Sequence, residues 1–314
     1  MMYRRQNKIM FIALTLATVL VVIGIIVAVA FPRRAVSAAL ALVIVGSIAF
    51  HFLTPWWWTD VASNWSNIDD TIILTFWVTG AVFCAVCLFM SYCVWRFRYS
   101  EDRKSDYKPE NSKLEWILTI LTTLGVCVLL APGLIVWNKF VTVPEGTADI
   151  EVMGQQWYWN YRLPGEDGVL GLTDLRNIND ENPFGMNLDD PNGLDDILIQ
   201  GDDLHILLDQ SVKMNLRSID VLHDFYIPQF RAKMDMVPGV ITYYWFTPIR
   251  TGDFEILCME YCGTGHYSMR GRVLVDEKKD YEEWLSEQMT FEEMMASIDK
   301  TDLIQLALNK KGDN

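Results

Sequence analysis

Four side chains that can bind a soft metal ion lie within twelve residues of this sequence. The stretch CMEYCGTGHYSM, residues 258–269, contains Cys258, Cys262, His266 and Met269, in a chain that has only six cysteines and four histidines. Thiolate, imidazole and thioether groups together favour copper or zinc over magnesium or calcium. The spacing therefore predicts a metal site on one short loop.

Two other interpretations of the two cysteines are open. A disulfide between Cys258 and Cys262 would close a very small loop under strain, and it would leave His266 and Met269 without a role. A structural zinc ion is the stronger alternative. It would require a fourth cysteine or histidine, however, and it makes no use of methionine, which is a weak and typically axial ligand of copper. Copper is therefore the favoured metal.

A further ligand is expected from another part of the chain. His205 lies in the alternating pattern DLHILLD, which is typical of a packed or half-exposed strand residue. His223 lies in SIDVLHDFYIPQF, where a strand is expected to end before Pro228. His223 therefore completes a set of two cysteines, two histidines and one methionine.

The motif C-x-E-x-C-x3-H-x2-M, with D-V-L-H earlier in the chain, resembles the binuclear copper site in subunit II of cytochrome c oxidases, which belong to the haem-copper oxidases. The resemblance covers residues from about 71 to 288 and includes KLEW, GQQWYWNY, DVLHDFYIP and KMDMVPG. It implies a cupredoxin-like fold and two copper ions in the copper A arrangement.

The resemblance also implies a ligand set. The thiolates of the two cysteines would bridge the copper ions, one histidine would bind each ion, and the methionine and a backbone carbonyl would be weak ligands. The implied ligands are His223, Cys258, the carbonyl of Glu260, Cys262, His266 and Met269. The side chain of Glu260 would contribute to a magnesium or manganese site shared with subunit I.

Two further residues receive roles from the resemblance. Trp157 in GQQWYW is similar to the surface tryptophan through which cytochrome c delivers its electron, whereas Trp159 is interpreted as a packed strand residue. Glu115 in KLEWILT is similar to a carboxylate at the entrance of a proton pathway in subunit I. A carboxylate beside a membrane span is otherwise often only an interfacial anchor.

The segments that must position these residues begin with a membrane part. Four runs without a charged side chain are each long enough to cross about 30 Å of hydrocarbon, which takes roughly 20 helical residues: 9–31, 35–54, 71–95 and 116–137. The link 96–113 contains six lysines and arginines, which places it in the cytoplasm. Four transmembrane helices then place the rest of the chain outside.

Charge divides the chain in the same way. Residues 1–139 carry 12 Lys and Arg against 8 Asp and Glu, whereas residues 140–314 carry 14 against 32, so the net charges are +4 and −18. An acidic surface repels nucleic acid and suits a basic partner, although it also simply keeps a domain soluble. Nucleic acid is therefore not expected among the partners.

The soluble part is predicted to be β-structure. Short stretches rich in β-branched and aromatic residues, separated by Pro, Gly and Asp, predict a sandwich or Greek-key barrel. The strands are expected within 148–163, 204–218, 240–248, 253–258 and 270–276. The predicted parts of the chain are an additional membrane segment at 1–60, a transmembrane hairpin of the subunit II type at 61–139, a cupredoxin-like copper domain at 140–276 with an acidic insertion at 164–196, and a C-terminal helical tail at 277–314.

These features predict the subunit of a respiratory cytochrome c oxidase that accepts electrons from cytochrome c and passes them to haem in subunit I, where oxygen is reduced to water with proton translocation. Subunits I and III, cytochrome c and the lipid bilayer are the expected partners. A bacterial inner membrane, with the copper domain in the periplasm, is favoured over a mitochondrial one because no Arg- and Ser-rich transit peptide precedes the first apolar run. The alternatives are subunit II of a quinol oxidase, which lacks the copper ligands, and a membrane copper chaperone, which would not need Trp157 or Glu260.

Overall fold

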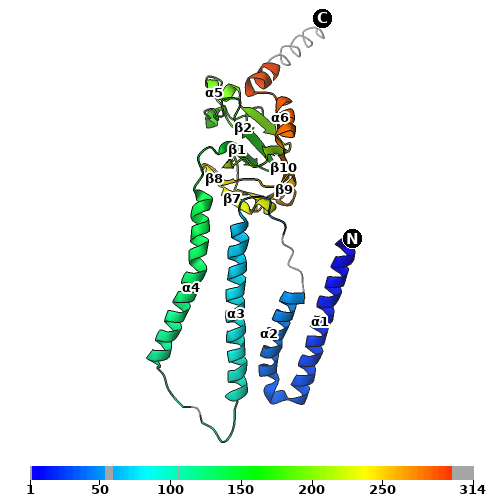
Figure 1. Cartoon of the computed structure of the whole chain (residues 1–314), viewed down its shortest axis with the longest axis vertical. Coiled ribbons are helices and arrows are strands. Elements are labelled where there is room, and N and C mark those ends of the chain that lie inside the picture. Colours follow the sequence, from blue (N-terminus) through cyan, green and yellow to red (C-terminus); the bar gives the residue numbers. More distant parts are fainter. Residues whose placement is uncertain (1, 54–58, 105, 299–314) are drawn as a thin grey trace. The chain divides into compact units, whose positions relative to one another are not determined.

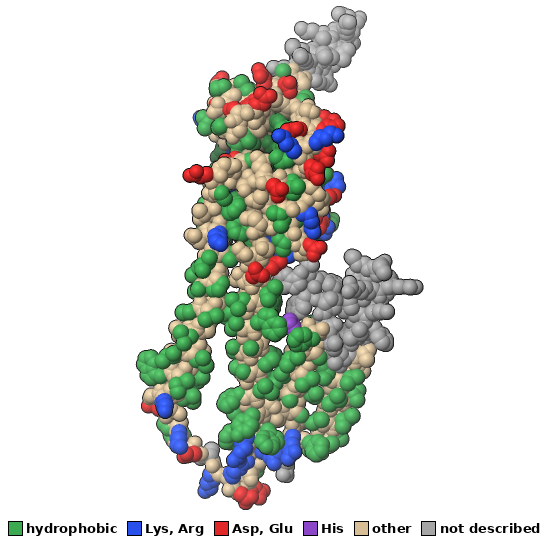
Figure 2. Space-filling view, viewed as in Figure 1, with side chains coloured by type: hydrophobic (Ala, Val, Ile, Leu, Met, Phe, Trp, Pro, Cys, Tyr) green, Lys and Arg blue, Asp and Glu red, His purple; other side chains and the backbone are tan. Residues whose placement is uncertain are grey.

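The computed structural model of the chain describes residues 2–53, 59–104 and 106–298. These residues divide into two compact units, Met1–Trp58 with Asp70–Gly133 and Thr59–Asp69 with Leu134–Asn314 (Figure 1). The first unit is helical, and hydrophobic side chains cover its helices in Figure 2. The second is mainly β-structure and carries most of the acidic side chains visible in that view. The predicted tail beyond residue 298 lies outside the described residues.

The helices of the membrane part are α1 (Met2–Ala30), α2 (Ala35–Leu53), α3 (Ser66–Arg96) and α4 (Ser112–Val141). Among the described residues, three helices are long and apolar enough to cross a membrane, namely α2, α3 and α4. The prediction of four spans is therefore wrong. In α1, the apolar helix found among the described residues is the shorter one at Ala17–Ala30.

Serine hydroxyls join two helices of the first unit. The Ser37 hydroxyl in α2 donates to the Ser91 carbonyl in α3 at 2.8 Å, and the Ser91 hydroxyl donates to the Ser37 carbonyl at 2.9 Å. Lipid offers no partner for a hydroxyl group, so this exchange favours contact between the two helices.

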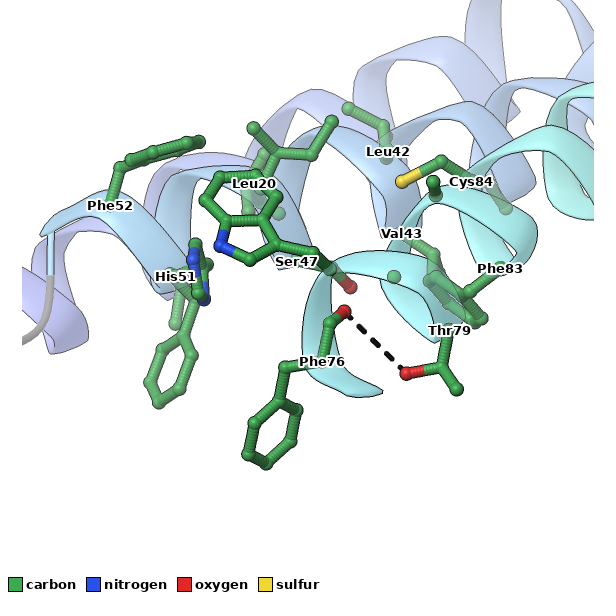
Figure 3. Close-up of a pocket in the computed structure, with 18 of the residues that line it drawn as sticks. Leu20, Leu42, Val43, Ser47, His51, Phe52, Phe76, Thr79, Phe83 and Cys84 are labelled. Atoms are coloured by element: carbon green, nitrogen blue, oxygen red, sulfur yellow. Dashed lines mark hydrogen bonds between the residues drawn. The ribbon is translucent and has the colours of Figure 1, made fainter. Parts of the chain in front are cut away.

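The same unit contains a cavity of about 1240 Å³ lined by α1, α2 and α3 (Figure 3). Its lining is mainly aliphatic and aromatic, and the rings of His51 and Trp77 lie 5.8 Å apart between centroids. The Thr79 hydroxyl on this lining donates to the Phe76 carbonyl. None of the residues predicted to bind metal or transfer electrons lines this cavity.

The predicted β-domain is confirmed, and it contains two five-stranded sheets. The first has the order β3 (Ile197–Gln200), β2 (Tyr158–Leu163), β1 (Ala148–Gln155), β5 (Val212–Ser218), β8 (Thr242–Phe246). The second has the order β4 (Leu204–Leu207), β10 (Arg270–Asp276), β9 (Gly252–Cys258), β6 (His223–Ile227), β7 (Ala232–Met236). A short C-terminal helix, α6 (Lys278–Ser286), follows β10.

Alternating side chains build the core between the sheets. In β5, Val212, Met214 and Leu216 are buried, while the residues between them are only partly buried. This period of two is the pattern of a strand with one face in a core. Side chains from both sheets, such as Val152 and Phe225, join one continuous hydrophobic cluster, so the domain is a β-sandwich.

The acidic insertion 164–196 covers the outer face of the first sheet. Phe184 and Met186 of the insertion pack against Met153 of β1 and against Phe291, which follows α6. All four side chains are at most 1% exposed. The insertion is therefore a folded part of the domain, and Phe291 of the segment after α6 packs against it.

A buried ion-pair network fixes the insertion to the sheet. Arg162 of β2 lies between Glu151 of β1, at 2.5 Å, and Asp196 at the end of the insertion, at 2.9 Å. Arg217 of β5 contacts the other carboxylate oxygen of Glu151 at 2.7 Å. Arg162, Glu151 and Asp196 are each at most 4% exposed. Each buried charge in this network therefore depends on its partners.

Residues 59–65, which precede α3 and are called the strap below, also belong to the β unit. The Ala62 amide donates to the Gln229 carbonyl at 2.8 Å, and the Ser63 hydroxyl donates to the Phe230 carbonyl at 2.7 Å. Ala62, Ser63 and Trp65 are almost completely buried. The strap thus adds side chains to the core of a domain whose strands begin more than 80 residues later.

Candidate metal centre

Two neighbouring strands of the second sheet bring distant parts of the chain to one edge. His223 is the first residue of β6 and Cys258 the last of β9, and the two strands pair with Phe225 opposite Cys258. The ligand loop then turns back, so that the Cys258 amide donates to the Met269 carbonyl at 3.3 Å just before β10. The predicted strand end before Pro228 is confirmed.

The structure brings the predicted donor atoms together. Cys258 Sγ lies 3.8 Å from Cys262 Sγ, 3.9 Å from His223 Nδ1 and 3.2 Å from the Glu260 carbonyl oxygen. Cys262 Sγ lies 3.6 Å from His266 Nδ1 and 3.7 Å from Met269 Sδ. The six predicted ligands therefore form one connected cluster around the two sulfur atoms.

These spacings fit metal binding. Ligand atoms held at about 2.0–2.3 Å from one tetrahedral ion lie roughly 3.3–3.8 Å from each other, which is close to the observed separations. Both cysteines are free thiols rather than a disulfide. His223, Cys258, Cys262 and Met269 are buried, so the donors face each other and not water. Soft sulfur and imidazole donors without a carboxylate oxygen in contact match copper better than magnesium or calcium.

The electrostatics of the two thiols differ. Burial by itself would raise the pKa of Cys258, but its hydrogen bonds with His223 and the surrounding backbone outweigh burial and lower the pKa to about 6. Burial and the neighbouring charge of Cys258 raise the pKa of Cys262 to about 12. At neutral pH the site therefore already holds one thiolate, which is the form that binds metals.

Asp220 orients His223. Its Oδ1 lies 2.8 Å from His223 Nε2 and accepts the Val221 amide, and its Oδ2 accepts the Gln156 amide at 2.7 Å. Burial lowers the pKa of His223, but the contacts with Cys258 and Asp220 outweigh burial and raise it. A proton on Nε2 leaves Nδ1 as the atom that faces the sulfur cluster. Sequence reasoning missed this role, although the D-x-x-H spacing was a usable signal.

Trp157 packs directly on the ligand loop. Its indole Nε1 donates to the Cys262 carbonyl at 3.2 Å, and Gln156 Nε2 donates to the same carbonyl at 2.7 Å. A Cβ on Gly265 would lie 2.3 Å from Trp157 Cδ2, so this position requires glycine. The indole is 37% exposed, which leaves one edge at the surface. The G-T-G-H spacing was the signal for this close approach.

The remaining candidates have different surroundings. The Glu260 side chain is partly buried. Among the described residues, the group that could hold a metal ion consists of His223, Cys258 and Cys262, without the Glu260 carboxylate. Glu115 lies in the first turn of α4, is exposed, and belongs to the other unit. His205 lies in β4, where Nδ1 is 2.5 Å from Asp276 and the ring stacks on Trp284 at 4.4 Å. Its interpretation as a strand residue is confirmed.

A second buried carboxylate lies beside the site. Asp224 follows His223, is fully buried, and stands opposite Asp235 across the β6–β7 pair. Burial and the hydrogen bond with Asp235 raise the pKa of Asp224 to about 7, although Lys233 at 3.2 Å acts in the opposite direction.

Comparisons with known proteins identify relatives of this chain. Residues 148–276 match the family profile described as cytochrome C oxidase subunit II, periplasmic domain. The alternative cytochrome c oxidase subunit 2 of Bradyrhizobium diazoefficiens is 58% identical over 257 residues, which cover 82% of this chain and 93% of that relative. The cytochrome c oxidase subunit 2 of Cereibacter sphaeroides is 28% identical over 237 residues, covering 73% and 77%.

Among solved structures, the periplasmic domain of subunit II of cytochrome oxidase from Bradyrhizobium japonicum is similar to this chain at 26% identity and a TM-score of 0.34. The match covers 46% of this chain and 95% of the chain in that structure.

Proposed function

This chain belongs to the family of cytochrome c oxidase subunit II, a component of the haem-copper oxidase complex, and from that premise we propose that it accepts electrons from a cytochrome c at a copper pair and passes them to haem in subunit I. The observation that carries the proposal is the cluster of five donors that includes two free thiols and is buried except for the partly exposed His266: His223, Cys258, Cys262, His266 and Met269.

The family implies a copper A centre, and the donor set of this chain fits it. His223, Cys258, Cys262, His266 and Met269 would hold the copper pair, which would supply rapid one-electron transfer. The protein contributes a rigid frame, because His223 and Cys258 lie on paired strands and the loop between β9 and β10 brings the other donors back to them. Burial keeps water from His223, Cys258, Cys262 and Met269, and Asp220 holds the His223 ring in place.

We place electron arrival at Trp157. One hydrogen bond joins its indole to the Cys262 carbonyl, which gives a short route from the surface to a residue that holds the copper pair. The net charge of −18 on residues 140–314 favours a basic donor, which is the expected character of a cytochrome c partner. A quinol oxidase subunit II lacks the copper ligands, whereas all of them are present here. A copper chaperone would not need the contact between the Trp157 indole and the Cys262 carbonyl.

Other assignments complete the proposal. The Glu260 side chain would bind magnesium or manganese at the contact with subunit I, and Glu115 would serve a proton pathway of subunit I; subunit III is a further partner. The chain is membrane-bound, and we propose the bacterial inner membrane, with the copper domain on the periplasmic side. Oxygen reduction and coupled proton translocation would take place in subunit I.

Metal analysis tests the proposed function. The full-length chain, purified in detergent and loaded with copper, is expected to hold two copper ions because two thiols can bridge them. The electron spin resonance spectrum should show one electron shared between two copper nuclei. One copper per chain, or a preference for zinc when both metals are offered, would contradict the proposal.

Replacing Trp157 with alanine should slow electron arrival while leaving the copper content unchanged. The indole supplies a contact to the Cys262 carbonyl but no metal ligand. We expect the rate of copper reduction by cytochrome c to fall at least about tenfold, with little change in the dissociation constant, because a single partly exposed side chain contributes modestly to docking. Stopped-flow absorbance of the assembled oxidase measures the rate. Tyr158→Ala, which removes the neighbouring exposed ring, is the matched control. Weaker binding without slower transfer would show that electrons arrive elsewhere.

A further inference from the structure

A second pocket, of about 370 Å³, lies where the strap and the end of α4 meet β8. Its lining consists of three asparagines, two tryptophans, one threonine and Lys139, all of which belong to the β unit. Its volume is in the range of small-molecule sites. It contains none of the proposed copper ligands, so it requires an explanation of its own.

The lengths of two helices place this pocket at the surface of the bilayer. α3 has 31 residues and α4 has 30, so both are about 45 Å long at 1.5 Å per residue. The hydrocarbon layer is about 30 Å thick, and the bilayer with its headgroups about 40–45 Å. Asn67 lies in the first turn of α3 and Lys139 in the last turn of α4, and both line the pocket. The pocket therefore lies at the depth of the lipid headgroups.

The polar groups of the pocket suit an anion. Lys139 forms no ion pair among the residues that the structure describes. Two carboxylates of the strap and the start of α3 are paired with bases, namely Asp60 with Arg250 at 3.7 Å and Asp69 with Arg231 at 2.7 Å. Asparagine amides beside the ammonium group and the positive end of α3 favour negative charge, whereas the negative end of α4 favours the Lys139 ammonium itself.

The two indoles form a fixed wall. Trp65 Nε1 donates to the Trp245 carbonyl at 2.8 Å, and Trp245 Nε1 donates to the Lys139 carbonyl at 3.0 Å. Because both N–H groups are bonded to the protein, the rings contribute apolar surface to the pocket. The second bond also fixes the backbone of Lys139. A rigid pocket with one cation and an apolar wall matches an amphiphile better than a free ion.

We propose that this pocket binds the phosphate-bearing headgroup of an anionic membrane lipid. The lipid phosphate contacts Lys139 and the asparagine amides, and the acyl chains follow the uncharged stretches of α3 and α4 into the hydrocarbon layer. This inference does not depend on the proposed electron transfer.

Native mass spectrometry of the full-length chain in detergent tests this site. The probes are phosphatidylglycerol, phosphatidylcholine and inorganic phosphate, each titrated separately. We expect one tightly bound phosphatidylglycerol per chain, and Lys139→Gln should weaken it roughly five- to tenfold because it removes a charge-assisted hydrogen bond. Lys139→Arg should restore binding. Lys113→Gln, at the other end of α4 and outside the pocket, is the matched control and should change binding less than about twofold.

Four outcomes would overturn the proposal. Equal binding of phosphatidylglycerol to wild type and Lys139→Gln would exclude the pocket as the site. Equal losses in the Lys139 and Lys113 variants would indicate unspecific attraction of anionic lipid. Inorganic phosphate that binds as tightly as phosphatidylglycerol would make the pocket a site for free anions, and equal binding of phosphatidylcholine would remove the requirement for negative charge.

Discussion

Replacing Cys258 with alanine is expected to remove both copper ions from the full-length chain. Cys258 Sγ lies within 3.9 Å of the Cys262 sulfur, the His223 ring nitrogen and the Glu260 carbonyl, so it connects the two halves of the donor cluster. A thiolate that bridges two ions cannot be replaced by the remaining donors. Copper content should fall from two ions to none, and the shared-electron signal in electron spin resonance should disappear.

Cys127→Ala provides the control for this change. Cys127 is an exposed free thiol on α4, in the other unit, and its loss should leave two copper ions in place. A Cys258→Ala protein that keeps one firmly bound copper would show that the donors form a mononuclear site around Cys262. Circular dichroism that matches the wild type would show that the domain is still folded.

Replacing Arg162 with methionine is expected to lower the free energy of unfolding of the β unit by about 3–5 kcal/mol, because breaking a buried ion pair leaves an uncompensated charge. After the substitution, Asp196 Oδ2 would keep a hydrogen bond from the Gly171 amide as its one described contact. Glu151 would keep its ion pair with Arg217. Urea unfolding of the copper-free chain in detergent, followed by tryptophan fluorescence, measures the change.

Arg176→Met is the matched control because it removes an arginine of the same acidic insertion. Arg176 pairs with Asp174 at the surface, where its side chain is 88% exposed. An exposed pair of this kind contributes little to stability because solvent screens it. Similar small effects for Arg162→Met and Arg176→Met would mean that the buried network does not hold the insertion, and that the apolar contacts of Phe184 and Met186 are sufficient.

The clustering of the candidate ligands could be predicted from the sequence because it depends on residue types and local spacing. Cys258, Cys262, His266 and Met269 are close in the chain, and one loop can bring them together whatever the rest of the fold is. His223 was found because few histidines compete for the role. The strand pattern of β5 was equally local, since alternation shows directly in the sequence.

The rest depends on contacts between distant residues. Asp196 is one of many acidic residues in the insertion, and nothing in its neighbourhood shows that it is buried against Arg162. The strap has no strand pattern of its own and takes its hydrogen bonds from Gln229 and Phe230. For α1, the uncharged run in the sequence predicted a span, whereas the apolar helix found there among the described residues is Ala17–Ala30.

The strap has a consequence for the order in which the chain folds. Ala62 bonds to Gln229, so its partner is synthesised more than 160 residues later, after α3 and α4. Until then the strap has no sheet to join, and its buried serine and tryptophan face solvent. Closing so long a loop is slow relative to forming local hairpins. The membrane helices are therefore translated before the sandwich is complete. The strap docks late, because it precedes α3 in the chain and its partners belong to a domain that forms afterwards.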